Sequence, residues 1–408
     1  MSKEKRRVPK LRFPGFTEDW EQRKLGDIAT FSKGNGYSKS DLVPSGSPII
    51  LYGRLYTNYE TTIKNVDTFV ELKDKSVISQ GGEVIVPASG ETAEDISRAS
   101  VVENQGIVIG GDLNVIKVKE FLHPTFLALT ISNGEQQKEL SKRAQGKSVV
   151  HLHNSDLQEV NLIFPLLHEQ KEISILFEKI DNIITLHQRK LNNIKLKKKA
   201  LLQKLFPKNG ERYPELRFPG FTDAWEQRKL SDVLVERNEQ QVETREYPLM
   251  SFVQGLGVTP KGERYDRSFL VLDQSKKYKR TELGDFIYSS NNLETGSIGI
   301  NKTGKAVISP VYSIFQGVTI GDSQFIGIMS LLPRFIAKMI RFRQGVVYGQ
   351  WRIHETDFLD ISVLIPSVDE RTKITQLILS IEKIITLHQR KLDHLQLQKK
   401  ALLQQMFV

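Results

Sequence analysis

The chain of 408 residues contains one unit twice. The segment LRFPGFT at 11–17 recurs unchanged at 216–222, and WEQRKL at 20–25 recurs at 225–230. The stretches between these segments and the next repeated blocks show little identity. A duplication with constant ends predicts two copies of one structural module, because each copy must keep the same fold. Divergent middles of similar length indicate that the two copies read different things, rather than simple drift after duplication.

The second pair of repeated blocks has the pattern of a helix. IITLHQRKL at 183–191 recurs at 384–392, and KKALLQ at 198–203 recurs at 399–404. Residues 169–206 contain neither proline nor glycine, which favours one long helix. At 1.5 Å per residue such a helix is roughly 57 Å long.

A heptad seam runs along both predicted helices. Steps of four and three residues pass through ten positions in each copy, of which eight are apolar. This pattern predicts a coiled coil, and the equal lengths make each helix the simplest partner of the other. We expect an antiparallel pair with pseudo-twofold symmetry, in which the two histidines set the register rather than bind metal. The central seam residues are Ile180, Ile184, His187, Leu191, Ile381, Ile385, His388 and Leu392.

The repeats divide the chain into four segments. Two globular domains at 1–168 and 207–369 are each followed by a spacer helix, at 169–206 and 370–408. Short β-like runs separated by Gly and Asn, with helical stretches after them, predict a mixed α/β (α+β) fold for both domains. In each, a glycine and an acid precede a strand that leads into a small polar loop, a weak signal for a projecting strand-exit loop.

Composition and charge exclude several classes of protein. The chain has no cysteine, which excludes disulfides, a thiolate nucleophile and zinc ribbons. The basic residues 1–10 are not followed by an apolar stretch, so we expect no signal peptide. We also find no apolar run long enough for a membrane span, and we expect a cytoplasmic protein that has no membrane contact. The net charge is +10, and the two helices carry nearly all of it. The globular domains are therefore close to neutral and would contact nucleic acid through local groups.

No catalytic or metal motif withstands inspection. The sequence QGKS at 145–148 lacks the glycine that a phosphate-binding loop needs five residues before Gly146. His151 and His153 have no further ligand at a suitable spacing, so we predict no metal site. The acids at 369–373 open a helix, where they suit the helix dipole better than a nuclease centre. We therefore expect no catalytic residues in this chain.

The repeated blocks resemble the specificity subunit of type I restriction–modification enzymes. The resemblance rests on the PGF…WEQRKL openers, the IITLHQRKL helices, the closing LLQ and the glycine–acid loops, and it covers essentially the whole chain. Glu83 stands where this family commonly has Asp, so the acidic group is retained.

The resemblance implies a function and a set of partners. Each divergent domain would be a target recognition domain that reads one half of a bipartite double-stranded DNA target. The paired helices would set the unread gap. The subunit would bind no cofactor and join two adenine-methylating (M) subunits, which use S-adenosylmethionine. Two ATP- and Mg-dependent translocase–nuclease (R) subunits would complete the complex. The alternatives are an autonomous DNA-modifying enzyme and a coiled-coil scaffold.

Candidate DNA contacts follow from residue chemistry. Arg, Asn and Gln suit bidentate contacts to bases, and lysine suits phosphates. We expect only part of the set to touch DNA, because ordinary surface residues look the same. The candidates are Lys33, Tyr37, Arg54, Tyr56, Ser89, Arg98 and Lys147 in the first domain, and Lys276, Lys277, Lys279, Arg280, Asn291, Asn292, Gln350 and Arg352 in the second.

Overall fold

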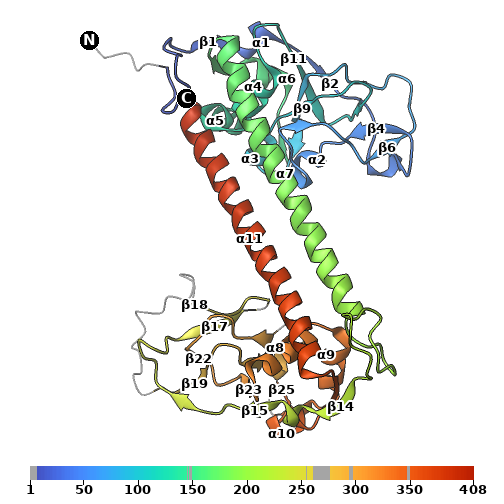
Figure 1. The fold of residues 1–408 in the computed structure, drawn as a ribbon. Helices are drawn as coiled ribbons and strands as arrows, with labels where there is room; N and C mark the ends of the chain where they lie inside the picture. Colours follow the sequence, from blue (N-terminus) through green and yellow to red (C-terminus); the bar gives the residue numbers. More distant parts are fainter. Residues whose placement is uncertain are drawn as a thin grey trace. The chain divides into compact units, whose positions relative to one another are not determined.

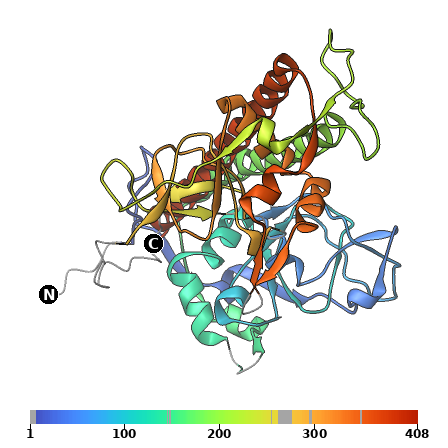
Figure 2. The same ribbon diagram turned by 90° about the horizontal axis from the view of Figure 1, so that it is seen from below.

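The chain forms two compact units (Figures 1 and 2), which we describe separately. Unit 1 comprises residues 1–189 and 390–408, and unit 2 comprises residues 190–389. A computed structural model describes residues 7–144, 146, 149–253, 255–260, 276–293, 297–346 and 350–408.

Unit 1 is a mixed helix and sheet domain. Its largest sheet has five strands in the order β2-β11-β7-β9-β5, and a four-stranded sheet has the order β10-β4-β6-β3. Two-stranded ladders join β1 to β13 and β8 to β12. The strands are β1 (Glu21–Lys24), β2 (Ala29–Lys33), β3 (Leu42–Val43), β4 (Ser47–Ile50), β5 (Thr62–Ile63), β6 (Phe69–Val70), β7 (Glu83–Pro87), β8 (Ser89–Gly90), β9 (Ser100–Val102), β10 (Val108–Ile109), β11 (Leu113–Val118), β12 (Val150–His151) and β13 (Asn161–Phe164). The short helices are α1 (Leu25–Ile28), η1 (Lys39–Asp41), α2 (Arg54–Thr57), α3 (Ala93–Ile96), α4 (Pro124–Ile131), α5 (Gly134–Arg143) and α6 (Asn154–Gln158).

Unit 2 has the same kind of architecture. Its sheets have the orders β15-β23-β20-β21 and β16-β19-β22, with ladders β14–β26, β17–β18 and β24–β25. The strands are β14 (Glu226–Lys229), β15 (Leu234–Glu236), β16 (Gln240–Gln241), β17 (Met250–Val253), β18 (Gly257–Pro260), β19 (Tyr278–Thr281), β20 (Phe286–Tyr288), β21 (Ile298–Ile300), β22 (Ala306–Ile308), β23 (Ser313–Gly317), β24 (Gln344–Val346), β25 (Gln350–Arg352) and β26 (Ser362–Ile365). The short helices are η2 (Leu230–Asp232), η4 (Ser290–Asn292), α8 (Ile320–Met329), α9 (Pro333–Ile340) and α10 (Glu355–Leu359).

The divergent domains share a sheet topology despite their different sequences. The antiparallel order β2-β11-β7-β9 of unit 1 corresponds to β15-β23-β20-β21 of unit 2. The opener strand pairs with the strand before the long helix in both units, as β1–β13 and β14–β26. The prediction that both copies keep one mixed fold is therefore confirmed.

Each globular domain is followed by a long helix, as the sequence predicts. Helix α7 spans Leu167–Lys204 and α11 spans Val368–Met406, two residues earlier than expected at each start. All twenty seam positions are buried or half-buried, including His187 and His388. The apolar seam is therefore the face that each helix turns away from solvent.

The compact units do not follow the linear division into four segments, because each unit takes one end of both helices. In unit 1 the core includes Phe407 from the end of α11, which stacks on Phe126 with ring centroids 5.6 Å apart. Figure 1 shows this end of α11 beside α5. In unit 2 the core includes Phe206, just after α7, which stacks on Phe325 at 5.4 Å. Each domain thus packs against the start of its own helix and the end of the other, so the pair is antiparallel.

Lysines in the seam form ion pairs between the helices. Lys399 of α11 lies 2.5 Å from the Asp181 carboxylate of α7 within unit 1. The equivalent pair in unit 2 joins Lys198 to Glu382 at 2.6 Å. These acids explain why two lysines can occupy seam positions that are otherwise apolar.

Candidate nucleic-acid interface

The glycine–acid motif builds the turn before the central strand of each domain. The Glu83 carboxylate accepts hydrogen bonds from the backbone N–H groups of Gln80 and Gly81, at 2.7 and 2.9 Å. Asp285 accepts one from the backbone N–H of Glu282 at 2.7 Å and pairs with Arg237 at 2.8 Å. Burial raises the pKa of Asp285, and these partners oppose that shift. The acids therefore hold the turn and do not point toward a ligand.

In unit 2 the loop after β20 lies against β25. The backbone N–H of Trp351 donates to Asn291 Oδ1 at 2.6 Å, and that of Ile353 donates to Ser290 Oγ at 3.0 Å. Asn291, Asn292 and Arg352 are all exposed beside this junction. Arg352 keeps 55% of its side chain exposed and lies 3.5 Å from Glu355. The structure thus brings Arg352 close to Asn291 and Asn292, which lie about 60 residues earlier in the sequence.

Unit 1 has a matching junction. Strand β8, directly after β7, pairs with β12 so that Gly90 faces Val150 and Ser89 faces His151. The Tyr56 hydroxyl donates to the Ser89 carbonyl at 2.7 Å, and burial raises the pKa of Tyr56 far above its usual value. Tyr56 and Ser89 are therefore neighbours, but the tyrosine hydroxyl is used to hold the loop.

Two predicted arginines of unit 1 form ion pairs with neighbouring acids. The Arg54 guanidinium contacts Glu60 at 2.8 Å and Asp67 at 3.1 Å, with only 14% of its side chain exposed. Arg98 pairs with Asp95 at 2.9 Å. The positions of these side chains speak against a DNA contact for Arg54 in this conformation, because its charge is already neutralised.

Two other predicted residues of unit 1 differ in their exposure and hydrogen bonding. Lys33 is exposed at the end of β2. The Tyr37 hydroxyl lies 2.6 Å from Ser76 Oγ and accepts from the Lys73 backbone N–H at 2.8 Å, so it holds a surface loop together. Lys147 lies outside the described residues.

The two cationic residues of β19 also lie beside acids. Lys279 has only 10% of its side chain exposed, with its Nζ 4.0 Å from Glu355. Arg280 pairs with Glu239 at 2.7 Å and Glu282 at 2.6 Å. Because the Lys279 side chain is buried beside Glu355, its ammonium group has no access to a ligand.

Just before β19, Lys276 and Lys277 are exposed and remain suitable for phosphate contact. The backbone of Gln350 belongs to β25, and its side chain lies outside the described part of the chain.

Sequence reasoning did not include Trp351. Its side chain is 49% exposed, whereas Trp20 and Trp225 are 2% and 1% exposed. The signal that could have found it is a tryptophan between Gln350 and Arg352, two residue types that favour nucleic acid.

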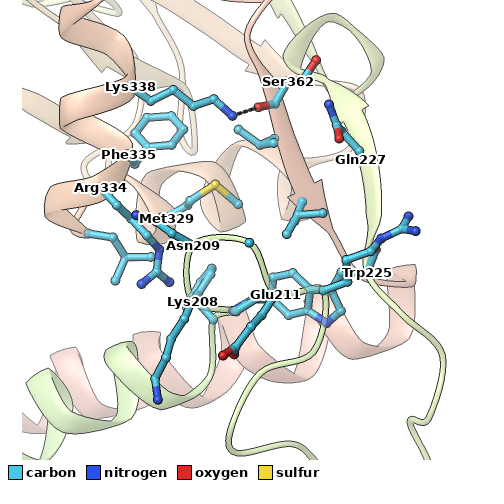
Figure 3. Close-up of a pocket in the computed structure, with 17 residues that line it drawn as sticks. Lys208, Asn209, Glu211, Trp225, Gln227, Met329, Arg334, Phe335, Lys338 and Ser362 are labelled. Carbon is cyan, nitrogen blue, oxygen red and sulfur yellow. Dashed lines mark hydrogen bonds between the residues drawn. The ribbon is translucent and has the colours of Figure 1, made fainter.

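A cavity of about 470 Å³ lies elsewhere in unit 2, between α9, the β14–β26 ladder and residues 206–212. Figure 3 shows Arg334, Phe335 and Lys338 along α9, with Trp225 and Gln227 across the cavity. Burial lowers the pKa of Arg334. None of the predicted DNA contacts lines this cavity.

The described residues hold no group of three or more His, Cys, Asp or Glu side chains placed to bind a metal ion. Among the helices whose positions are described, none is long and apolar enough to cross a membrane.

Comparison with known proteins gives one consistent result. Residues 17–196 match the family described as "Type I restriction modification DNA specificity domain". The chain is 22% identical over 413 residues to the type I restriction enzyme MjaVIII specificity subunit of Methanocaldococcus jannaschii, covering 96% of this chain and 92% of that protein. Its fold resembles the crystal structure of the type I restriction–modification system S subunit from M. genitalium, with a TM-score of 0.66, 13% identity and coverage of 98% and 99%.

Proposed function

Because this chain belongs to the specificity subunits of type I restriction–modification systems, we propose that its two domains each read one half of a bipartite DNA target. The subunit itself recognises DNA and leaves catalysis to its partners. The observation that carries the proposal is the repeated scaffold with different loops in the same place. Strand β7 leads to the β8–β12 junction, and β20 leads to the η4–β25 junction.

The exposed members of the predicted set are the proposed DNA contacts. Their side chains reach solvent, whereas Arg54 and Lys279 are largely buried beside acids, and Arg280, with 32% of its side chain exposed, is paired with Glu239 and Glu282. Phosphate contacts would position the subunit, and the amide and guanidinium groups would read base edges. The proposed contacts are Lys33, Lys276, Lys277, Asn291, Asn292 and Arg352.

The helices offer a surface for two identical partners. Three of the large apolar residues that are exposed on α7 have an exposed residue of the same type on α11, at an offset of 201. One repeated surface on each helix suits two copies of one partner, which we assign to the adenine-methylating subunits. S-adenosylmethionine would then bind to those subunits, and two ATP- and Mg-dependent translocase–nuclease subunits would join them. The repeated residues are Ile183, Leu186 and Leu196 on α7, and Ile384, Leu387 and Leu397 on α11.

Methylation mapping tests the proposal directly. The chain is co-expressed with the methylating subunit encoded beside it, and modified adenines are sequenced genome-wide. We expect one split motif, and replacement of residues 30–150 by the equivalent part of a relative should change only one half. Modification by the purified chain alone would indicate an autonomous enzyme, and partner binding without any DNA dependence would indicate a scaffold.

A second experiment tests the role of the helices. Insertion of seven residues into each helix preserves the heptad register and lengthens each helix by roughly 10 Å. We expect a longer unread gap with unchanged half-sites. An unchanged gap in a variant that still methylates would contradict the role of the helices as a spacer.

The partner surface has its own matched control. Leu186→Glu together with Leu387→Glu should abolish co-purification of the methylating subunit, because a charge would be buried in each contact. Leu166→Glu is the control, since Leu166 is 70% exposed but has serine at the equivalent position 367. Loss of binding in the control as well would show that exposed leucines do not define the contact.

A further inference from the structure

Trp351 is unusual among the tryptophans of this chain. The chain has three, and Trp20 and Trp225 lie in the cores of units 1 and 2. Trp351 leaves 49% of its surface in contact with solvent. Tryptophan is enriched at binding surfaces, because its large rigid ring offers apolar contact area and its N–H can still donate a hydrogen bond.

The surroundings of Trp351 fix its backbone and leave about half of the residue exposed. Its backbone N–H is held by Asn291 Oδ1 at 2.6 Å. The residue across the β24–β25 ladder is Gly345, which has no side chain to lie over the indole. A Cβ added at Gly345 would meet nothing within 4 Å, so the space beside the strand is open.

The charge near Trp351 favours a polyanion. Residues 341–352 contain three arginines, and the acids that contact this segment include Glu355, 3.5 Å from Arg352, and Asp357, which accepts from Gln344. Arg352, next in the chain, is 55% exposed and is one of the proposed DNA contacts. An aromatic face flanked by guanidinium and amide groups is the combination with which proteins hold nucleobases.

The equivalent position in unit 1 has a different residue. His153 and His354 are 201 residues apart and cap the equivalent helices α6 and α10. The same offset places Val150 opposite Trp351. Val150 is 9% exposed, so unit 1 lacks an aromatic face at this point. The scaffold is shared, but at this position unit 2 has an exposed aromatic residue and unit 1 has a buried valine.

We propose that Trp351 is a stacking site for a nucleobase of the DNA half-site read by unit 2. The inference rests on the proposed function and adds a contact that is made to the face of a base rather than its edge. Apolar side chains that insert into duplex DNA open a base step and expose the face of a base. The indole stacks on such an exposed face. Arg352 and Asn291 then contact the backbone or base edges beside it.

Fluorescence quenching tests this proposal. The full chain in complex with the methylating subunit is titrated with acrylamide, with and without duplex DNA that carries the mapped target. The difference between the wild type and Trp351→Phe isolates the emission of Trp351. We expect bound DNA to reduce quenching of this component at least several-fold, because a stacked indole is shielded.

Binding measurements give an independent readout. Trp351→Ala should weaken target binding roughly 5- to 100-fold, the range for loss of one base–aromatic stack, and Trp351→Phe should recover most of it. The dependence of affinity on salt should not change, because stacking releases no counterions. Tyr213→Ala is the control, since Tyr213 is a 55% exposed aromatic outside the proposed contacts, and it should bind as the wild type does.

The outcomes separate the two proposals. A complex that binds and methylates its target while Trp351 stays equally accessible, with no loss of affinity in Trp351→Ala, overturns the stacking site and leaves the proposed function standing. A complex that shows no preference for any DNA sequence overturns both.

Discussion

Units 1 and 2 make the same contacts where their sequences repeat. Arg12 forms a bidentate ion pair with Glu169, with both contacts at 2.7 Å, and Arg217 does the same with Glu370 at 2.7 and 2.8 Å. Both glutamates are only 1% exposed. The repeated blocks therefore fix each domain to the start of its own helix.

Where the domains diverge, the same junction is built from different residues. The acid at the equivalent position of each helix joins the globular domain to both helices. In unit 1, Thr61 donates to Asp181 at 3.1 Å while Lys399 pairs with it. In unit 2, Lys302 takes the place of the threonine and lies 2.6 Å from Glu382. The two units therefore keep a contact between the globular domain and this acid, but the residue that makes the contact differs.

The largest expected effect comes from removing the aromatic residue that the end of one long helix contributes to the core of the other domain. Phe407→Ala should destabilise unit 1 by about 3–5 kcal/mol, because it removes a buried aromatic ring and leaves a cavity. Phe206→Ala should do the same to unit 2. Hydrogen exchange resolved by mass spectrometry measures each unit separately. Residue 407 follows the second globular domain in sequence but belongs to the core of unit 1. A loss of protection in unit 2 after Phe407→Ala would therefore contradict this packing.

Removal of the repeated arginine should cost somewhat less. Arg12→Ala leaves the Glu169 carboxylate buried without its partner, which we expect to destabilise unit 1 by about 3 kcal/mol. The remaining 13% exposure of Arg12 lets water reach the gap and limits the loss. Arg217→Ala should have an equal effect on unit 2. Urea unfolding followed by hydrogen exchange checks this, and unequal effects would show that the two pairs are not equivalent.

An arginine from each unit sharpens the distinction between structural and DNA-binding cations. Arg352→Gln should weaken DNA binding by about 1–3 kcal/mol. Arg54→Gln should leave DNA binding nearly unchanged and reduce the stability of unit 1 instead, because Arg54 is held by Glu60 and Asp67. Fluorescence anisotropy with the mapped target measures the first effect. Equal losses of affinity would show that Arg54 leaves its ion pairs to contact DNA.

The smallest expected effect concerns the helix junction and pH. Burial raises the pKa of Glu382, but Lys302 and Lys198 outweigh it and hold the pKa below its ordinary 4.5. The folded pKa is depressed, so the contribution to stability is present above pH 4.5 and is lost as the pH falls through the folded pKa.

Glu382→Gln tests this junction. It should lower the stability of unit 2 by about 1 kcal/mol at neutral pH, since a hydrogen bond to a charged group is lost. The loss should shrink below pH 4.5, which urea midpoints between pH 7 and 3 would show. A difference from the wild type that stays constant with pH would mean that the charge of Glu382 does not stabilise the unit. Asp181→Asn is the matched variant in unit 1.

Patterns that repeat along the chain were predictable. The seam follows from apolar spacing alone, and the structure buries or half-buries all of its positions. The strand-exit loops were also visible, because a glycine and an acid precede both. The DNA candidates were less predictable, since Arg54 and Arg352 look alike in sequence. The fold distinguishes them: Arg54 is 14% exposed and contacts two acids, whereas Arg352 is 55% exposed and has one acid 3.5 Å away.

The sequence by itself determined that the chain holds two copies of one module joined by heptad helices, and it indicated the family. Those features depend on repetition and on local periodicity, which neighbouring residues carry. Only the tertiary structure decided that Phe407 completes the core of the first unit, and that Lys279 is buried while Trp351 is exposed. Each of these depends on contacts between residues far apart in the chain. No local pattern records such contacts, because burial and charge neutralisation are decided when distant segments pack together.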